Sequence, residues 1–242
     1  MKENVLRETD EAARALARKL IREAPFAALA VNEPETGFPL ASRVLLATDI
    51  DGAPAILISR LSVHTRAIEA DSRVSILTGE PAKGDPLAHP RLTTRCHAHL
   101  LSREGEHHSR LRERFLSRHK KAKTYIDFPD FNLFRLEPVS ANLNGGFGRA
   151  YALDKDDIVR PDALSGYQWL DLPFVKKHAE SILSQVQIQG LALIDIDPEG
   201  IYVRNGQEIF RHDFEKVATN NDELLSFFHE LVGKYPKFKI TF

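Results

Sequence analysis

In several segments of the first 150 residues, hydrophobic and polar residues alternate with the two-residue period that is typical of half-buried strands. Asp51-Gly52 between two such runs predicts a hairpin turn. The predicted barrel strands cover residues 26–31, 40–49, 55–59, 73–78, 92–101, 131–139 and 140–147, the last two separated at Pro138. Helical spacing predicts covering helices at residues 10–23 and 104–121 and a short helix at 67–70. The pattern therefore predicts an antiparallel barrel with covering helices.

The remainder of the chain has a different pattern. Residues 154–162 are rich in aspartate and contain a proline, which is typical of a linker between domains. A helix is expected around Val175 to Val186 and another from Asn221, with strands at 191–196, 201–204 and 208–210 between them. We therefore predict two domains, residues 1–152 and 161–242, the second a small α+β unit.

Composition and charge argue against several classes of function. The 33 Lys and Arg residues balance 34 Asp and Glu residues, for a formal charge of −1, so we expect neither nucleic acid nor a membrane surface as partner. Cys96 is the single cysteine, which excludes an intramolecular disulfide. The charged start and the lack of any run of eighteen apolar residues favour a cytoplasmic protein. The basic side chains of helix 104–121 are expected to be solvated.

A run of hydroxyl and basic residues lies between the strand at 55–59 and the helix at 67–70. Ser62 and Thr65 carry hydroxyl groups, and Arg60, His64 and Arg66 surround them. Because a helix N-terminus presents unpaired N–H groups and a partial positive charge, this run could bind a phosphate group. Ser62 could equally serve only as a helix cap.

Histidines cluster in the same half of the chain. His97 and His99 would lie on one face of a strand, with His89, His107 and His108 nearby in sequence. No carboxylate or thiolate occurs at ligand spacing with them except Cys96, which alternation places on the opposite face. We therefore predict no metal site.

Several motifs in sequence order carry a resemblance to a known family. Residues 42–46, 55–59, 62–65 and 71–77 resemble the flavin mononucleotide (FMN)-binding split barrel of the pyridoxamine 5′-phosphate oxidase superfamily. Residues 90–93, 127–131 and 145–150 resemble the branch of that superfamily with an extra C-terminal domain, which includes haem-binding and haem-degrading members. The resemblance implies an α+β fold, a split β-barrel of the FMN-binding type plus a small α+β domain. It also implies a homodimer with a small-molecule site at the subunit interface.

The resemblance implies a cofactor site as well. The residues expected to hold FMN are Ser42, Arg43, Val44, Leu45, Ile58, Ser59, His64 and Thr65. Ser42 and His64 stand where the oxidase carries its phosphate-binding Arg and Lys, so the charge would come from Arg43, Arg66 or a protonated His64. The first hypothesis is an FMN-dependent oxidoreductase of unknown substrate. No catalytic acid or base is predicted, since flavin chemistry does not require one.

Two alternatives remain open. The chain could be a haem-binding or haem-degrading protein, in which case a histidine such as His178 should bind the iron. Those relatives usually open the C-terminal domain with Met-Asn-x-Asp-His, and residues 174–178 retain only the histidine. The chain could also be a ligand-free binding or structural dimer that keeps the barrel alone.

Overall fold

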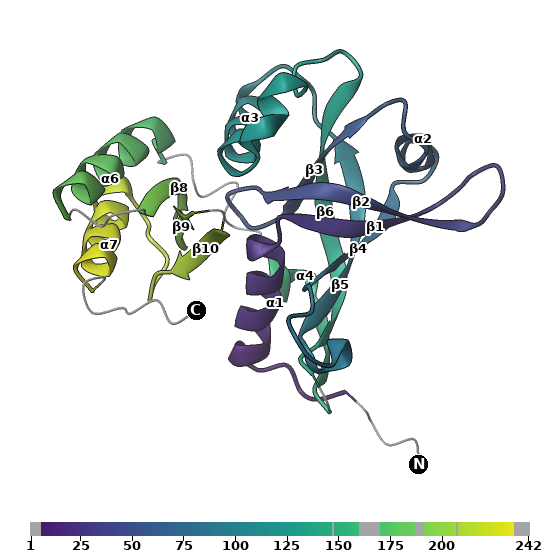
Figure 1. Cartoon of the computed structure of the whole chain (residues 1–242), viewed down its shortest axis with the longest axis horizontal. Coiled ribbons are helices and arrows are strands. Elements are labelled where there is room, and N and C mark those ends of the chain that lie inside the picture. The colour runs from purple at the N-terminus through teal and green to yellow at the C-terminus, as the bar shows by residue number, and fades with distance from the viewer. Residues whose placement is uncertain (1–5, 147, 160–169, 187–190, 207, 235–242) are drawn as a thin grey trace. The chain divides into compact units, whose positions relative to one another are not determined.

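The computed structural model describes residues 6–146, 148–159, 170–186, 191–206 and 208–234 (Figure 1). Contacts within the chain divide it into two compact units, Met1–Pro161 and Asp162–Phe242, and each is described by itself. None of the helices among the described residues combines the length and the apolar character that crossing a membrane requires.

Six antiparallel strands of the first unit form a closed barrel. The strands are β1 (Phe26–Asn32), β2 (Pro39–Thr48), β3 (Pro54–Ser59), β4 (Arg73–Thr78), β5 (Arg91–Leu100) and β6 (Phe131–Asn144). They are paired in the order β3-β2-β1-β4-β5-β6, and pairing of β3 with β6 closes the barrel. β7 (Ala150–Asp154) pairs with residues 140–144 of β6. The α+β fold with a split β-barrel is confirmed.

Among the described residues, four helices and two 3-10 turns accompany the strands of the first unit. They are α1 (Glu11–Glu23), α2 (Val63–Ala70), α3 (Glu106–Arg118) and α4 (Lys155–Ile158), with 3-10 turns at Pro86–Ala88 and Lys120–Thr124. Asp10 caps the first helix, because its carboxylate accepts a hydrogen bond of 2.7 Å from the Ala13 amide. The helix stops before Pro25, which cannot continue it.

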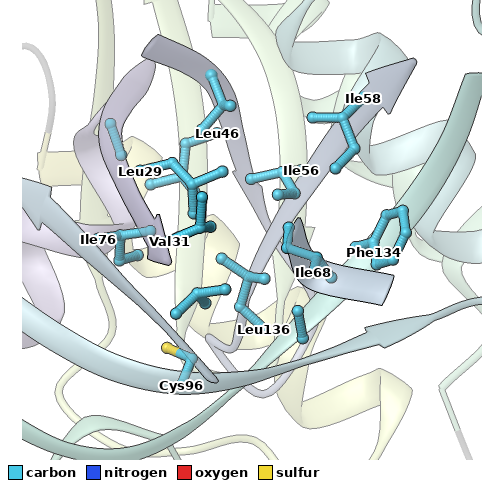
Figure 2. Packing of buried hydrophobic residues seen from close by; sticks show 14 of the residues in the cluster. Leu29, Val31, Leu46, Ile56, Ile58, Ile68, Ile76, Cys96, Phe134 and Leu136 are labelled. Atoms are coloured by element: carbon cyan, nitrogen blue, oxygen red, sulfur yellow. The ribbon is translucent and has the colours of Figure 1, made fainter. Parts of the chain in front are cut away.

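Side chains fill the interior of the barrel (Figure 2). Leu29, Leu46, Ile56, Ile76 and Leu136 are fully buried there. Ala67 and Ile68 of α2 belong to the same cluster, so this helix packs against the barrel core. Because the interior is occupied by packed aliphatic groups, a ligand has to bind at an end or on the outer face.

One predicted strand boundary is wrong. Residues 131–144 form the single strand β6, in which Arg95 of β5 pairs with Ser140 and Cys96 pairs with Pro138. Val139 is therefore an extra residue, and the ladder passes Pro138 through a β-bulge. A bulge accommodates a proline because the local ladder hydrogen bonds are already interrupted.

The predicted linker is also wrong over its first residues. Asp154 ends β7, and α4 follows directly with a reciprocal capping box between Asp154 and Asp157. The Asp157 carboxylate also accepts a hydrogen bond of 2.6 Å from Arg14 of α1. Asp154 therefore caps α4 and Asp157 binds it to α1, roles that charge composition alone does not reveal. Residues 160–162 of the predicted linker lie outside the described residues.

The second unit is a small α+β structure. Its elements are α6 (Leu172–Val186), β8 (Leu191–Asp197), β9 (Gly200–Asn205), β10 (Glu208–Asp213) and α7 (Asn221–Lys234). The strands form an antiparallel sheet in the order β10-β9-β8, and α6 and α7 contact each other. Buried Arg211 donates hydrogen bonds of 2.8 and 2.9 Å to Asp197, so this pair links β10 to β8.

Candidate functional site

The predicted site residues on β2 point in alternate directions, as strand geometry requires. Ser42 Oγ lies 3.1 Å from His64 Nδ1 on α2. Arg43 points outward, with its guanidinium 4.9 Å from the centre of the Phe26 ring. Val44 is buried in the barrel core, whereas Leu45 is partly exposed on the outer face. Arg43 and Leu45 can therefore reach an external ligand, and Val44 cannot.

Two of the predicted residues around the start of α2 use their hydroxyl groups within the protein. Ser59 Oγ donates to Asp130 at 2.7 Å, and Thr65 Oγ1 donates to the Ser59 carbonyl at 2.6 Å. The Thr65 and Arg66 amides donate to the Ser62 carbonyl at 3.1 and 3.4 Å. A phosphate at this turn would have to displace these bonds.

The charge of the turn is also unfavourable for an anion. Burial lowers the pKa of His64, so this imidazole is neutral at pH 7. Arg66 has an exposed side chain, and the Asp130 carboxylate lies beside Ser59. Charge-assisted hydrogen bonds are roughly twice as strong as neutral ones, and this turn presents no fixed, buried cation among the residues described. Ile58, the remaining predicted residue, is buried in the core.

A groove on the outer face of the barrel was not predicted. This apolar groove has a volume of about 610 Å³. It lies where the C-terminal end of α1 meets β1, β2 and β4. The lining includes the apolar residues Leu20, Ala24, Phe26, Ala28 and Leu77, the predicted residues Ser42 and Arg43, and the charged residues Lys19, Glu23 and Glu80. The volume falls within the usual range for small-molecule sites.

The sequence held a signal for this groove. Strand β1 reads Phe-Ala-Ala-Leu-Ala-Val-Asn, so both of its faces are apolar, and exposed Ala28 and Ala30 alternate with buried Leu29. A strand that is apolar on both faces is typical of a sheet whose outer side is covered. The partner across the groove, Leu77, comes from β4 and pairs with Ala28, a contact that requires knowledge of the register.

His178 of the second unit has the local geometry of a metal ligand. Its Nδ1 lies 2.8 Å from the Phe174 carbonyl oxygen, which can only accept, so Nδ1 carries the hydrogen. The Phe174 ring lies 4.1 Å away, between ring centres. Metal-binding histidines commonly donate one ring N–H to such an acceptor, which leaves the other nitrogen free to coordinate. The side chain is exposed on α6.

The other histidines have individual partners. His97 Nδ1 lies 3.1 Å from Ser72 Oγ, and His99 lies 3.4 Å from Glu137. His107 Nε2 lies 2.7 Å from the Asp49 carboxylate. Within the described ranges no three side chains of metal-binding type lie together.

The expectation that the basic helix is solvated is wrong. Asp49, which has no exposed surface, accepts hydrogen bonds from His107, Arg110 and Arg135 at 2.7 to 3.4 Å. Arg114 is also buried, and it donates to the Thr48 carbonyl at 3.0 Å. Burial by itself would raise the pKa of Asp49, but these three partners outweigh it and hold the pKa well below its usual range. The charges of α3 therefore bind the helix to the β2–β3 turn.

Comparisons with known proteins agree with the motifs in the sequence. The profile of the CREG beta-barrel family matches residues 8–159. The chloroplastic non-canonical haem oxygenase HOZ of Arabidopsis thaliana is 24% identical over 181 residues, which are 69% of this chain and 55% of that protein. The haem oxygenase HutZ of Vibrio cholerae is 31% identical over 107 residues, 43% of this chain and 61% of that protein. The chain thus spans little more than half the length of these relatives.

A solved structure extends the likeness to most of the chain. The haem-binding protein from Mycobacterium smegmatis superposes with a TM-score of 0.57 and 24% sequence identity, and covers 96% of this chain and 100% of that one. At this identity the likeness concerns the fold alone. The family profile, by contrast, covers residues 8–159, which include all six barrel strands. The chain belongs to the CREG beta-barrel family.

Proposed function

We propose that this chain binds haem on the outer face of its barrel and that it acts in haem degradation. This makes the second hypothesis from the sequence the leading one, in place of an FMN-dependent oxidoreductase. Two relatives that match its sequence, HOZ and HutZ, are haem oxygenases. Near the start of α2, where an FMN phosphate was expected, the Ser59 and Thr65 hydroxyls and two backbone amides form hydrogen bonds within the protein.

The apolar groove is the observation that carries the proposal. Ala28 and Leu77 are exposed on the floor of the groove, and Phe26 with Arg43 above it forms a wall. A flat, largely apolar ring would remove this surface from water, which stabilises the complex in proportion to the buried area. The groove therefore fits a porphyrin ring by its size and its apolar lining.

The groove does not itself supply a residue of the types that commonly bind haem iron. Its lining residues include no histidine, cysteine, methionine or tyrosine. The sequence hypothesis that His178 binds haem iron stays a proposal about the second unit by itself, because its Nδ1–H is bound to the Phe174 carbonyl and its other nitrogen is available. The assignment rests on the local geometry of His178 within the second unit.

Haem, when bound, supplies the iron at which oxygen chemistry takes place. The residues of this chain would bind and orient the ring. Leu77 and Ala28 would exclude water from one face of the ring, and Arg43 beside Phe26 would contact the edge of the ring.

We further propose that the chain is a homodimer, as the resemblance implies. The outer faces of β1, β2 and β4 expose Ala28, Ala30, Ala41, Leu45 and Leu77. A contiguous exposed apolar surface commonly marks an interaction site. A second copy placed over this surface would cover it and enclose the ligand. Sedimentation of the purified chain tests this, and a strictly monomeric species with bound haem would contradict it.

Separate titrations with haem and FMN, followed by absorption spectroscopy, test the proposed function. We expect a saturable haem band and no retained flavin. Ala28→Trp would fill the apolar groove and should weaken haem binding by about tenfold, a typical penalty for overpacking. The matched variant His64→Ala changes the start of α2 and should leave haem binding unchanged. Retained FMN that is lost in His64→Ala, with no saturable haem band, would overturn the proposal.

A further inference from the structure

The ladder between β1 and β4 is short, and a second groove lies beside it. The two strands are paired only at Ala28–Ala30 with Ser75–Leu77. A groove of about 360 Å³ lies beside this ladder, lined by the end of β1, the start of β2 and the start of β4. This basic groove is lined by Ala30, Val31, Asn32, Pro39, Arg73, Val74, Ser75, Arg95, Cys96, His97 and Val139.

The charge of the basic groove differs from that of the apolar groove. Its lining contains Arg73, Arg95 and His97 and no carboxylate, whereas the apolar groove combines two basic with two acidic residues. Arg73 is paired with Asp71 at 2.6 Å, so its charge is partly balanced. Arg95 forms no ion pair with any residue in the described part of the chain. An unbalanced guanidinium in a concave site attracts an anion.

Arg95 is held in place by its neighbours on β6. Its Nη1 lies 3.3 Å from Ser140 Oγ and 3.4 Å from Asn142 Oδ1. The β-bulge at Val139 lies directly beside this position, between the pairs of Arg95 and Cys96. Bulges occur often beside functional sites, where they change the direction of a side chain. The guanidinium is thus oriented by neutral groups that leave its charge available to a ligand.

The two grooves are neighbours on the same face of the sheet. Ala28 and Leu77 line the apolar groove, and Ala30 and Ser75, two positions further along the same strands, line the basic one. Residues two apart on a strand share a face and lie about 7 Å apart. The outer face therefore presents an apolar surface that leads directly into a cationic one.

We propose that the basic groove binds the carboxylate groups of the tetrapyrrole whose ring lies in the apolar groove, with Arg95 as the main contact. This inference rests on the proposed haem binding. The ligand it predicts is an amphipathic planar dicarboxylate, oriented with its acidic edge toward β5. His97 and Ser75 would supply further hydrogen-bond donors at the same edge.

The test compares haem with its uncharged dimethyl ester, each titrated against the full chain. Wild-type protein should bind haem about fivefold more tightly than the ester, the ratio expected for one partly exposed charge-assisted bond. Arg95→Gln should abolish this preference, so that the two affinities become equal, without changing the affinity for the ester. Arg95→Lys, which retains the charge, should preserve part of the preference.

Arg60→Gln is the matched control, because Arg60 is exposed and lines neither groove. It should leave the preference for haem over the ester unchanged. Equal affinities of the wild type for haem and ester, or a preference that Arg95→Gln retains, would overturn the carboxylate site alone. Loss of the preference in Arg60→Gln would place the carboxylates at the α2 end and also overturn it. Failure of both haem and ester to bind would instead overturn the proposed function. Inorganic phosphate that competes equally with haem and ester would indicate a free-anion site, which also contradicts the inference.

Discussion

Two basic regions of the barrel domain use their charges in opposite ways. On α3 the cations contact Asp49, which has no exposed surface, and they are neutralised inside the protein. On the outer face of β5, Arg95 is exposed and bound only to neutral groups of β6. The difference teaches that a basic stretch of sequence stabilises the fold where it meets a buried carboxylate, and remains available for a ligand where it does not.

The largest effect should follow from removing the buried carboxylate. Asp49→Asn leaves His107, Arg110 and Arg135 without their shared anion and should lower the free energy of unfolding by about 3 kcal/mol. Urea unfolding measures this. Asp71→Asn, which removes a partly exposed carboxylate beside Arg73, is the control and should change stability less. Equal effects of the two substitutions would contradict the comparison.

Acid should expose the same difference. The pKa of Asp49 is held below its ordinary value of 3.8, so the stability that it contributes is fully present above pH 4. That contribution is lost as the pH falls below 3.8 toward the lower pKa of the folded state. Unfolding curves between pH 5 and about 2 should therefore converge for the wild type and Asp49→Asn. Parallel curves would show that the carboxylate is not specifically stabilised in the folded state.

The third prediction concerns the proposed iron ligand. His178→Ala should weaken haem binding by at least about tenfold and shift the haem absorption band, because the coordinating nitrogen is lost. His229→Ala removes another exposed histidine, from α7, and serves as the control. An unchanged spectrum in His178→Ala would move the ligand to another residue.

A smaller effect is expected at the start of α2. Burial lowers the pKa of His64 below its ordinary value of 6.5, so its contribution to stability is present above pH 6.5 and is lost as the pH falls through the lower pKa of the folded state. His64→Gln should remove this mild acid sensitivity and leave haem affinity unchanged. Melting temperatures of both proteins between pH 5 and 8 provide the measurement, and identical pH profiles would contradict it.

Local patterns were sufficient to predict much of the fold. The alternation on β1, β2 and β5 gave those strands, and Asp10 followed by helical spacing gave the start of α1. The β6 bulge and α4 were missed, because both depend on partners far away in sequence. Pro138 is tolerated through the pairing of Cys96 with β6, and Asp157 is ordered by Arg14.

The site was harder to predict than the fold for a related physical reason. Hydroxyl groups at the start of α2 resembled a phosphate site, but Asp130 and the Ser59 carbonyl already use them. Conversely, the apolar groove depends on the register that places Ala28 beside Leu77. Sequence gives the chemistry of each side chain, whereas the partner that satisfies it is decided by contacts between distant strands.

A crystal structure of the full chain with bound haem tests the central claim most directly. The account predicts the ring on the outer face of β1 and β4, over Ala28 and Leu77, with a carboxylate within hydrogen-bonding distance of Arg95. A ring at the start of α2 beside His64 and Thr65 would contradict it.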